Sequence, residues 1–392
     1  MALLNKIQEL SKLYFEDVRR IRRHLHAHPE LSFDEHETAK FVESELDKIG
    51  ITDRKRMAKT GIVALIEGKN PQSRTVALRG DLDALPIQEL NNCEYKSTMP
   101  GVMHACGHDV HTSSLLGAAR ILNETKADWE GTVKLIFQPG EEKLPGGASL
   151  LIEEGVLFNP APQSIYGQHV MPFIQAGKVG FRKGLYMAST DEIYMTVHGK
   201  GGHGAMPHLN IDPILIAANI ITALQQVVSR RSKPIVPSVL SIGKVIANGA
   251  NNVIPNEVYM EGTFRTLDEA WRDEAHKHIR AICESTATSM GGSIDLQIER
   301  GYPHLINDVV LTEAAIAKAE TYLGKENVLE IDIWMAAEDF SYYSQAIPAC
   351  FYRLGTRNEA LGIISSVHTP TFDIDETALE TGMGLMAWMA VG

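Results

Sequence analysis

Apolar and polar positions between residues 61 and 180 alternate between two patterns. Short apolar runs typical of buried strands alternate with longer runs whose apolar residues recur three and four positions apart, as on one face of a helix. The predicted strands are 75–86, 131–142 and 164–170, and the predicted helices are 112–124 and 146–157. This alternation predicts an α/β fold with a mostly parallel sheet covered by helices.

The pattern changes near residue 187. Here 191–202 reads as an alternating strand and 212–230 as a long helix, in which Asp212 can cap and Pro213 fits the first turn. Two strands, a helix over 267–290 and a last strand over 293–300 follow. The order strand–helix–strand–strand–helix–strand is that of a ferredoxin-like α+β unit. We therefore predict a larger domain, 1–185 and 301–392, interrupted by a small inserted domain, 186–300.

Polar clusters follow the predicted strands of the larger domain. DLD, QPGEE and GQH all come where a strand ends, and ligands of open α/β sheets bind outside the carboxyl ends of the strands. We therefore expect the chemistry of the protein at this edge of the sheet.

Composition and charge restrict the class of partner. The formal net charge of −12 argues against a nucleic-acid partner, which requires a basic face. Four dispersed cysteines in 392 residues do not form a disulfide framework and fit a reducing compartment. The first 26 residues read as an amphipathic helix and not as a signal peptide, and no stretch is apolar enough to span a membrane. We expect a cytoplasmic protein without a membrane partner.

The segment HACGHDVHT, residues 104–112, is the strongest chemical signal. Cys106 and His108 offer a thiolate and an imidazole, both good zinc ligands, and Asp109 is placed to orient an imidazole. Glu141 and Glu142 follow a predicted strand and precede a Gly-Gly turn. Of two adjacent carboxylates, one can bind a metal ion while the other takes a proton from water.

Two further histidines, His169 and His368, follow in GQHVMP and SSVHTP. Each by itself is typical of a structural histidine, but with Cys106, His108 and Glu142 they make five ligands. Five ligands suffice for two divalent cations that share one bridging ligand and keep open positions for water and substrate.

Two other motifs favour a structural interpretation. The tract HLHAHPE adjoins a basic helix and reads as structural or solvated. GKGGHG, residues 199–204, matches G-x-G-x-x-G, but Met206-Pro207 interrupts it where a helix should open. A dinucleotide site is therefore rejected.

Taken together, the motifs resemble the amidohydrolase branch of the aminoacylase and carboxypeptidase G superfamily, which includes hippurate hydrolases, auxin-conjugate amidohydrolases and N-acyl-amino-acid deacylases. The resemblance covers nearly the whole chain through the segments RRHLHAHPELSFDEHET, RGDLDALP, GVMHACGHDVHT, FQPGEE, GQHVMP, GGHGAMPH, NVIPNEV, AEDFSYY and VHTP. It implies that the inserted domain is a lid and a homodimer interface.

The resemblance also implies roles for individual residues. Cys106 bridges two metal ions, His108 and His169 complete one of them, and Glu142 and His368 complete the other. In the same way Glu141 is the general base, Asp83 orients a metal ligand, His203 stabilises the oxyanion, and Asn252 and Arg265 bind substrate. Where many members of the wider superfamily carry a ligand histidine, this chain carries Asp81, and His108 takes its place.

The sequence therefore predicts metal-dependent hydrolysis of the amide bond of N-acyl amino acids or related small conjugates, through water activated by two metal ions. Zinc or manganese fits the ligand set best, and cobalt or nickel is also accepted by such sites. The alternatives are a dipeptidase of the same fold and a non-catalytic metal- or ligand-binding protein.

Overall fold

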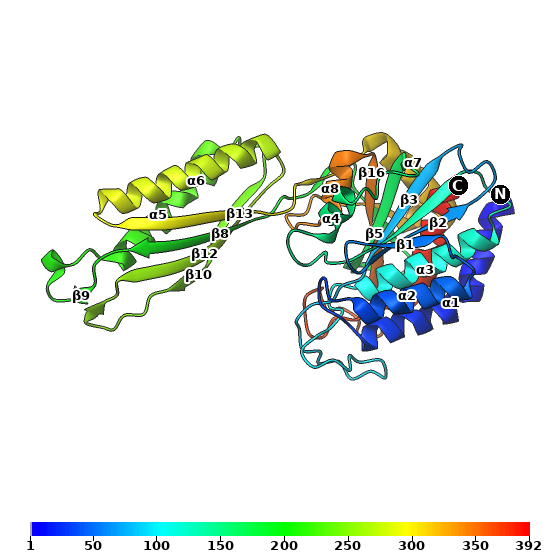
Figure 1. Cartoon of the computed structure of the whole chain (residues 1–392), viewed down its shortest axis with the longest axis horizontal. Coiled ribbons are helices and arrows are strands. Elements are labelled where there is room, and N and C mark those ends of the chain that lie inside the picture. The colour runs from blue at the N-terminus through cyan, green and yellow to red at the C-terminus, as the bar shows by residue number, and fades with distance from the viewer. Residues whose placement is uncertain (1) are drawn as a thin grey trace. The chain divides into compact units, whose positions relative to one another are not determined.

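The computed structural model describes residues 2–392, and the chain divides into two compact units (Figure 1). Unit 1 comprises the residues up to Gly184, Ile306–Ile333 and Asp339–Gly392. Unit 2 comprises Leu185–Leu305 and Trp334–Glu338. Each unit has its own buried apolar core.

Unit 1 is built on an 8-stranded sheet with the order β1-β2-β4-β3-β5-β16-β6-β15. Its strands are β1 (Arg54–Met57), β2 (Gly61–Glu67), β3 (Thr75–Asp81), β4 (Thr132–Gln138), β5 (Ser164–Gln175), β6 (Val179–Phe181), β15 (Val328–Glu330) and β16 (Ala349–Arg357). The four central strands, β4, β3, β5 and β16, run parallel to one another, whereas β1, β2 and β6 pair antiparallel with a neighbour. The predicted fold class, an α/β fold with a largely parallel sheet, is confirmed.

Helices cover both faces of this sheet (Figure 1). They are α1 (Ala2–Ala27), α2 (His36–Lys48), α3 (His108–Glu124), α4 (Gly147–Glu153), α7 (Val309–Leu323), α8 (Ser341–Ala346) and α9 (Ala378–Val391). Helices α1, α3 and α9 pack together on one face, while α4 and α8 contact β4 and β16. The central strands are buried on both faces, which explains why β3 and β4 read as apolar runs without alternation.

Unit 2 holds a 4-stranded antiparallel sheet with the order β10-β12-β8-β13. Its elements are β8 (Asp191–His198), α5 (Pro213–Gln226), β10 (Ser238–Ile246), β12 (Glu257–Thr266), α6 (Glu269–Ser289) and β13 (Ser293–Arg300). Their order along the chain is the ferredoxin-like one expected. Asp212 caps α5 by accepting from Ile214 N and Leu215 N, and Pro213 occupies its first turn, as predicted.

Shorter elements complete the fold. They are β7 (Gly184–Met187), β9 (Gly202–His203), β11 (Val253–Ile254), β14 (Leu305–Asn307), the 3-10 turns η1 (Pro207–Leu209) and η3 (Lys325–Asn327), and a π turn, η2 (Val227–Arg231), that extends α5. The GKGGHG segment leads through β9 into a turn and η1, so the helix that a dinucleotide fingerprint requires is absent there.

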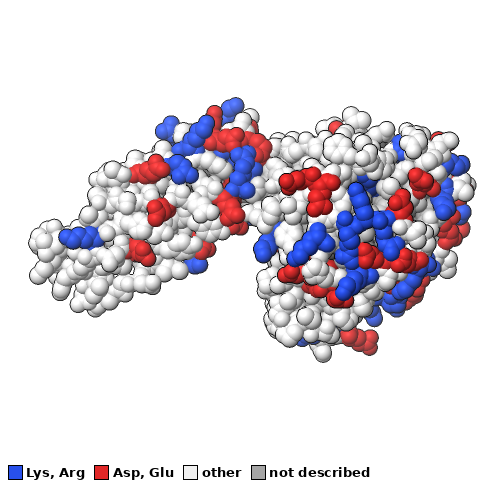
Figure 2. Space-filling view, in the orientation of Figure 1, with Lys and Arg blue, Asp and Glu red and all other residues white. Residues whose placement is uncertain are grey.

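Acidic and basic side chains are interspersed on the visible face of unit 1 (Figure 2). Ion pairs around α2 include Arg56 with Glu43 and Lys40 with Glu37. Exposed pairs of this kind each stabilise a fold by less than about 1 kcal/mol. No helix of the described residues combines the length and apolar character needed to cross a membrane.

Because the central strands position the polar residues at their ends, their packing should be the main source of stability in unit 1. Replacing Leu78 by Ala, which removes a fully buried side chain from β3, is expected to cost about 2–5 kcal/mol in urea unfolding of the metal-free protein. Leu13→Ala, at an exposed position of α1, is the matched control and should change stability by less than about 0.5 kcal/mol. Equal effects of the two substitutions would contradict a dominant role for the buried strands.

Candidate metal centre

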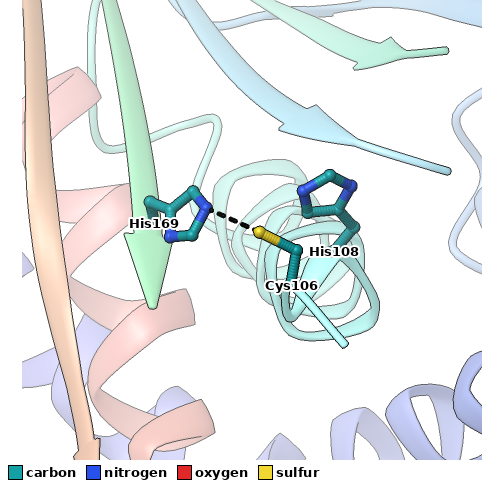
Figure 3. Close-up of side chains that lie close together, drawn as sticks. All are labelled: Cys106, His108 and His169. Atoms are coloured by element: carbon teal, nitrogen blue, oxygen red, sulfur yellow. Dashed lines mark hydrogen bonds between the residues drawn. The ribbon is translucent and has the colours of Figure 1, made fainter. Parts of the chain in front are cut away.

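Near the carboxyl ends of β3 and β4, unit 1 brings together side chains that are far apart in the sequence. The prediction that His169 ends a strand is wrong, because β5 continues to Gln175. Cys106 lies in the turn before α3, His108 is the first residue of α3, and His169 lies on β5 (Figure 3). Their ligand atoms lie within 4.8 Å of one another, and Cys106 Sγ is 3.3 Å from His169 Nε2. All three side chains are buried, so each is shielded from competing water.

A second group shares the same cysteine. Cys106, Glu142 and His368 also place their ligand atoms within 4.8 Å of one another. His368 Nε2 lies 3.3 Å from Cys106 Sγ and 3.2 Å from Glu142 Oε1. The loop that carries His368 is tied to the cysteine turn, because His368 N donates to Ala105 O over 2.8 Å. Cys106 therefore stands between two sets of ligands.

Gly107 makes the turn between Cys106 and His108 feasible. Its φ of +81° lies in the left-handed region, and a Cβ at this position would come within 2.6 Å of Val170. Glycine thus allows the thiol and the first imidazole of α3 to lie close together against β5.

Hydrogen bonds decide which ring nitrogen each histidine presents to the centre. His108 Nδ1 donates to Asp83 Oδ1 over 3.2 Å, and within residues 2–392 its buried Nε2 has no hydrogen-bond partner. His169 Nδ1 donates to Val170 O over 2.8 Å, so its Nε2 faces Cys106. Such partners fix the tautomer and orientation of metal-binding imidazoles.

His111 lies beside the centre but has both nitrogens engaged. Its Nδ1 donates to Asp81 Oδ1 over 2.6 Å, and its Nε2 accepts from Val170 N over 2.9 Å. Asp81, His108 and His111 also form a group within 4.8 Å. Because His111 has no free lone pair, we assign it to the support of the centre and not to its ligands.

Two of the candidate ligand side chains, His108 and Cys106, hold a proton at neutral pH in the metal-free chain. Although burial favours the neutral ring, Asp81 and Asp83 raise the pKa of His108 to about 10. Burial, with Glu142 and Glu141 nearby, raises the pKa of the Cys106 thiol well above its ordinary value. By contrast, burial and the neighbouring Arg353 hold the pKa of His169 well below its ordinary value, so this ring is neutral.

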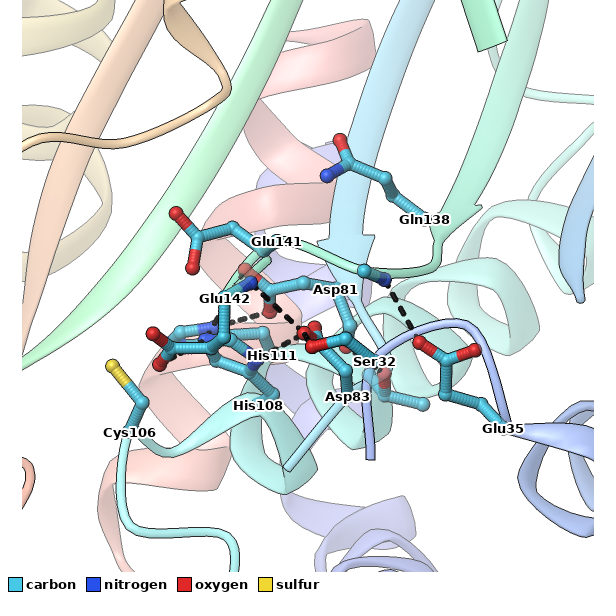
Figure 4. Close-up of polar contacts among 12 residues, drawn as sticks. Ser32, Glu35, Asp81, Asp83, Cys106, His108, His111, Gln138, Glu141 and Glu142 are labelled. Atoms are coloured by element: carbon cyan, nitrogen blue, oxygen red, sulfur yellow. Dashed lines mark hydrogen bonds and ion pairs between the residues drawn. The ribbon is translucent and has the colours of Figure 1, made fainter. Parts of the chain in front are cut away.

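The two adjacent carboxylates differ in their surroundings (Figure 4). Glu142 belongs to the group with Cys106 and His368, and its backbone N donates to Asp83 Oδ2 over 2.9 Å. Glu141 is buried within the group that includes His108, and its Oε1 accepts from Asp339 N over 3.4 Å. Asp83 thus contacts both a candidate ligand ring and the loop of the two glutamates.

The donor set fits a pair of divalent cations. One thiol, three imidazole nitrogens and a carboxylate converge, and one buried nitrogen, His108 Nε2, lacks any hydrogen-bond partner in the described chain. Sulfur and imidazole nitrogen are good zinc ligands, and two groups that share one sulfur match a bridged dinuclear site.

Three other residues with predicted roles lie in unit 2. His203 pairs with Val253 across β9 and β11, and Gly204 N donates to Asn252 O over 2.8 Å, so His203 and Asn252 are neighbours. Arg265 lies on β12, where Val239 is its cross-strand partner. All three residues lie in unit 2. Their roles at the metal centre of unit 1 stay predictions.

Several supporting residues were not recognised in the sequence. Asp109 was expected to orient an imidazole of the site, but it accepts instead from Arg22 Nε and His26 Nδ1, each over 2.8 Å. His26 thereby gives the HLHAHPE tract its structural role, since it is fully buried. Arg22 also donates to Asp373 over 3.0 Å, so the end of α1 joins the α3 turn to the loop after His368.

Paired metal-ligand groups at the strand ends of an α/β sheet define a metal-dependent hydrolase as the class that fits this geometry. The sequence matches the profile of peptidase family M20/M25/M40 over residues 77–390. The chain belongs to this family, which confirms the resemblance and the assignment to metal-dependent hydrolases.

Three proteins of similar sequence are named as hydrolases. The putative amidohydrolase YhaA of Bacillus subtilis is 40% identical over 96% of this chain and 94% of its own length. An IAA-amino acid hydrolase, ILR1-like 4 of Arabidopsis thaliana, is 40% identical over 96% of this chain and 86% of its own. The N-acyl-L-amino acid amidohydrolase of Geobacillus stearothermophilus is 43% identical over 76% of this chain and 81% of its own.

Solved structures agree with the fold. A putative aminohydrolase from methicillin-resistant Staphylococcus aureus has a TM-score of 0.88 and 36% identity, covering 98% of both chains. The Bacillus subtilis YXEP protein, described as a dinuclear metal-binding peptidase, has a TM-score of 0.81 and 35% identity over 97% of this chain and 98% of its own.

Metal binding should release protons, because His108 and the Cys106 thiol hold them in the metal-free protein at neutral pH. We expect about one to two protons released per chain at pH 7.5, and an affinity that rises with pH up to the pKa of His108, about 10. Calorimetric metal titrations in buffers of different ionisation enthalpy measure this number. An affinity that is flat between about pH 6.5 and 8.5 would contradict the protonated state of these two groups.

Proposed function

We propose that the chain hydrolyses the amide bond of N-acyl amino acids or related small conjugates, with Glu141 as general base. The metal ligands in this proposal are Cys106, His108, Glu142, His169 and His368. The observation that carries it is the sharing of Cys106 by two ligand groups with Glu141 beside them. A structural metal site has no use for an additional buried carboxylate next to its ligands.

Divalent cations held by these ligands would polarise the substrate carbonyl and acidify a water molecule. Glu141 is placed to receive the proton of the attacking water, because its carboxylate lies with His108 and Glu142 and is shielded from solvent. The same carboxyl group can then deliver the proton to the leaving nitrogen. General acid–base transfer of this kind contributes about 10²–10⁴-fold to a rate.

Asp83 acts by orientation in this scheme. Despite its burial, the hydrogen bond from His108 lowers the pKa of Asp83, so it remains a carboxylate and an acceptor. It holds the His108 ring and the Glu142 backbone at the same time. A ligand from α3 and a ligand from the loop after β4 are thereby kept in register.

His203 has a hydrogen-bonding pattern that suits an oxyanion donor. Its Nδ1 accepts from Ala205 N over 3.0 Å, so the neutral ring carries its hydrogen on Nε2. An exposed N–H of this kind can donate to a developing negative charge on the substrate oxygen. We assign Asn252, its neighbour, and Arg265 to substrate binding, with the Arg265 guanidinium matching the free carboxylate of an amino acid.

The ligand types indicate which metals to test, and the amide bond indicates which substrates. A thiolate with imidazoles favours zinc, manganese fits the carboxylates, and cobalt or nickel can substitute in an exchangeable pair. A dipeptide offers the same amide and terminal carboxylate as an N-acyl amino acid, so dipeptidase activity is the second arm of the assay. A panel of N-acetyl and N-benzoyl amino acids and dipeptides, each with the four metals, tests the proposal.

We also propose a cytoplasmic homodimer formed through unit 2. Both α5 and β10 of this unit carry exposed apolar side chains, namely Ile214, Leu215, Val245 and Ile246. The four cysteines, all free, suit a reducing compartment.

Substitution of the two glutamates should separate base from ligand. Glu141→Gln is expected to lower kcat by about 10²–10⁴-fold while two metal ions stay bound, because only the proton acceptor is lost. Glu142→Gln, the adjacent control, should reduce the bound metal to about one ion per chain. Kinetics with excess metal and metal analysis after gel filtration measure both effects. Retention of most of the activity in Glu141→Gln would refute the base assignment.

The dimer proposal is tested by charge insertion. The double variant Leu215→Glu/Val245→Glu should raise the dimer dissociation constant by about 100-fold or more, because two exposed apolar anchors are replaced by like charges. Light scattering across a concentration series measures it, with Leu13→Glu, exposed on α1, as control. A wild type that is monomeric at every concentration would disprove the interface.

A further inference from the structure

The loop that carries Glu141 and Glu142 is closed on itself. Gly147 N donates to Gly140 O over 3.1 Å, so residues 140–147 leave β4 and return to the start of α4. A side chain at Gly147 would place its Cβ 1.7 Å from Pro139 O, which shows how tightly the two ends of the loop approach. The conformation of the loop therefore determines where both glutamates point.

Three buried carboxylates hold this loop and the start of α4 by accepting from their backbone amides. Asp83 accepts from Glu142 N over 2.9 Å, and Asp339 accepts from Ala148 N over 2.9 Å. The third is Glu35, whose Oε1 accepts from Gly140 N over 2.8 Å. Asp83 also binds His108, and Asp339 also binds the buried Arg79 of β3. Glu35 makes its hydrogen bonds away from the candidate ligands, to Gly140, Phe33 and Thr60 (Figure 4).

The position of Glu35 suggests a helix cap, but its side chain does not act as one. It precedes α2 in the N-cap position, yet it makes no side-chain hydrogen bond to the first turn of that helix. The carboxylate turns back instead, where Oε2 accepts from Thr60 Oγ1 over 2.6 Å and Oε1 accepts from Phe33 N over 2.9 Å. The first-turn amides of α2 are bound by Glu30 instead, which accepts from Glu37 N over 3.2 Å and from Thr38 N over 2.8 Å, so the Glu35 carboxylate serves the loop and not the helix.

Phe33 supports the same contact. Its φ of +68° is unusual for an aromatic residue, and its amide is held by Glu35. A Cβ at Gly140 would lie 2.3 Å from the Phe33 ring, so the ring packs directly on the first residue of the loop. Glu35 thus fixes both the loop and the strained turn on which the loop rests.

We propose that Glu35 is a positioning residue of the metal centre, acting through Gly140 to set the geometry of Glu141 and Glu142. This inference rests on the proposed function of those two glutamates. Glu35 touches neither substrate nor metal, so its effect must appear in the placement of the loop. The Glu35 carboxylate is the acceptor in all three hydrogen bonds. A glutamine has the same shape, and its Oε1 can accept from Gly140 N and Phe33 N in the same way.

The test compares Glu35→Ala, Glu35→Gln and the matched control Asp34→Asn, whose exposed carboxylate pairs with Lys59. With saturating metal, Glu35→Ala should lower kcat by about 30- to 100-fold, because misplacement by about an ångström has effects of this size. KM should change by less than about threefold, since no substrate contact is removed. Glu35→Gln should retain at least about a third of kcat, and Asp34→Asn should match wild type.

Hydrogen exchange of the metal-free protein supplies a readout that does not depend on activity. In Glu35→Ala, peptides covering 139–147 should exchange faster while peptides covering β3 keep their rates. The affinity for one of the two zinc ions, measured with a chelating indicator, should fall together with this change.

Unchanged kcat and unchanged exchange of 139–147 in Glu35→Ala would overturn the inference, as would faster exchange throughout unit 1. Equal damage in Glu35→Ala and Glu35→Gln would also overturn it, because the carboxylate charge would then matter and not the acceptor geometry. If Glu35→Ala does not fold, Glu35→Asp, which withdraws the carboxylate by one methylene, takes its place. If the wild-type protein is inactive but Glu35→Ala still speeds the exchange of 139–147, the result counts against the proposed function alone.

Discussion

The burial of carboxylates at the carboxyl ends of β3 and β4 is the constraint on which the rest of unit 1 depends. Asp81, Asp83 and Asp339 are almost completely inaccessible to solvent. Desolvation of an ion costs several kcal/mol, so such groups persist only where donors surround them. Asp81 accepts hydrogen bonds from Arg79 and His111. Asp339 accepts hydrogen bonds from Arg79, Gln138 and the backbone amide of Ala148. Helix α3 and the glutamate loop are held in place because they supply these donors.

The same requirement sorts the histidines into ligands and supports. A ring that gives Nδ1–H to a carboxylate or a carbonyl keeps Nε2 for a metal, and His108 and His169 do this. His111 gives one nitrogen to Asp81 and uses the other for Val170 N, which leaves nothing for a cation. By distance alone, all three imidazole rings would qualify as metal ligands. The hydrogen bonds to the surrounding carboxylate and backbone groups distinguish them.

The sequence was sufficient to locate a residue where its position follows from local pattern or from a motif. Strand ends and the periodicity of 75–86 and 131–142 located the edge of the sheet, and Cys106, His108, Glu142, His169 and His368 do converge there. It was insufficient where the partner is distant in the chain. Nothing around Glu35 or Arg22 signals that their charged groups turn inward toward Gly140 and Asp109. The assignment of Trp334–Glu338 to unit 2 is of the same kind, since it depends on contacts that no periodicity encodes.

Electrostatics then explains why such a site accepts cations. Despite burial, the negative charges of Asp81, Asp83 and Glu142 raise the pKa of His108, and burial together with Glu142, Glu141 and Asp81 raises the pKa of the Cys106 thiol. In the metal-free chain the protons on these two groups compensate part of that negative charge. A cation that replaces them leaves the local charge nearly balanced, whereas an empty, deprotonated centre would bring several carboxylates and a thiolate together without compensation. The buried carboxylates therefore orient the ligands and, by the same charge, set the sign of the ion that the centre binds.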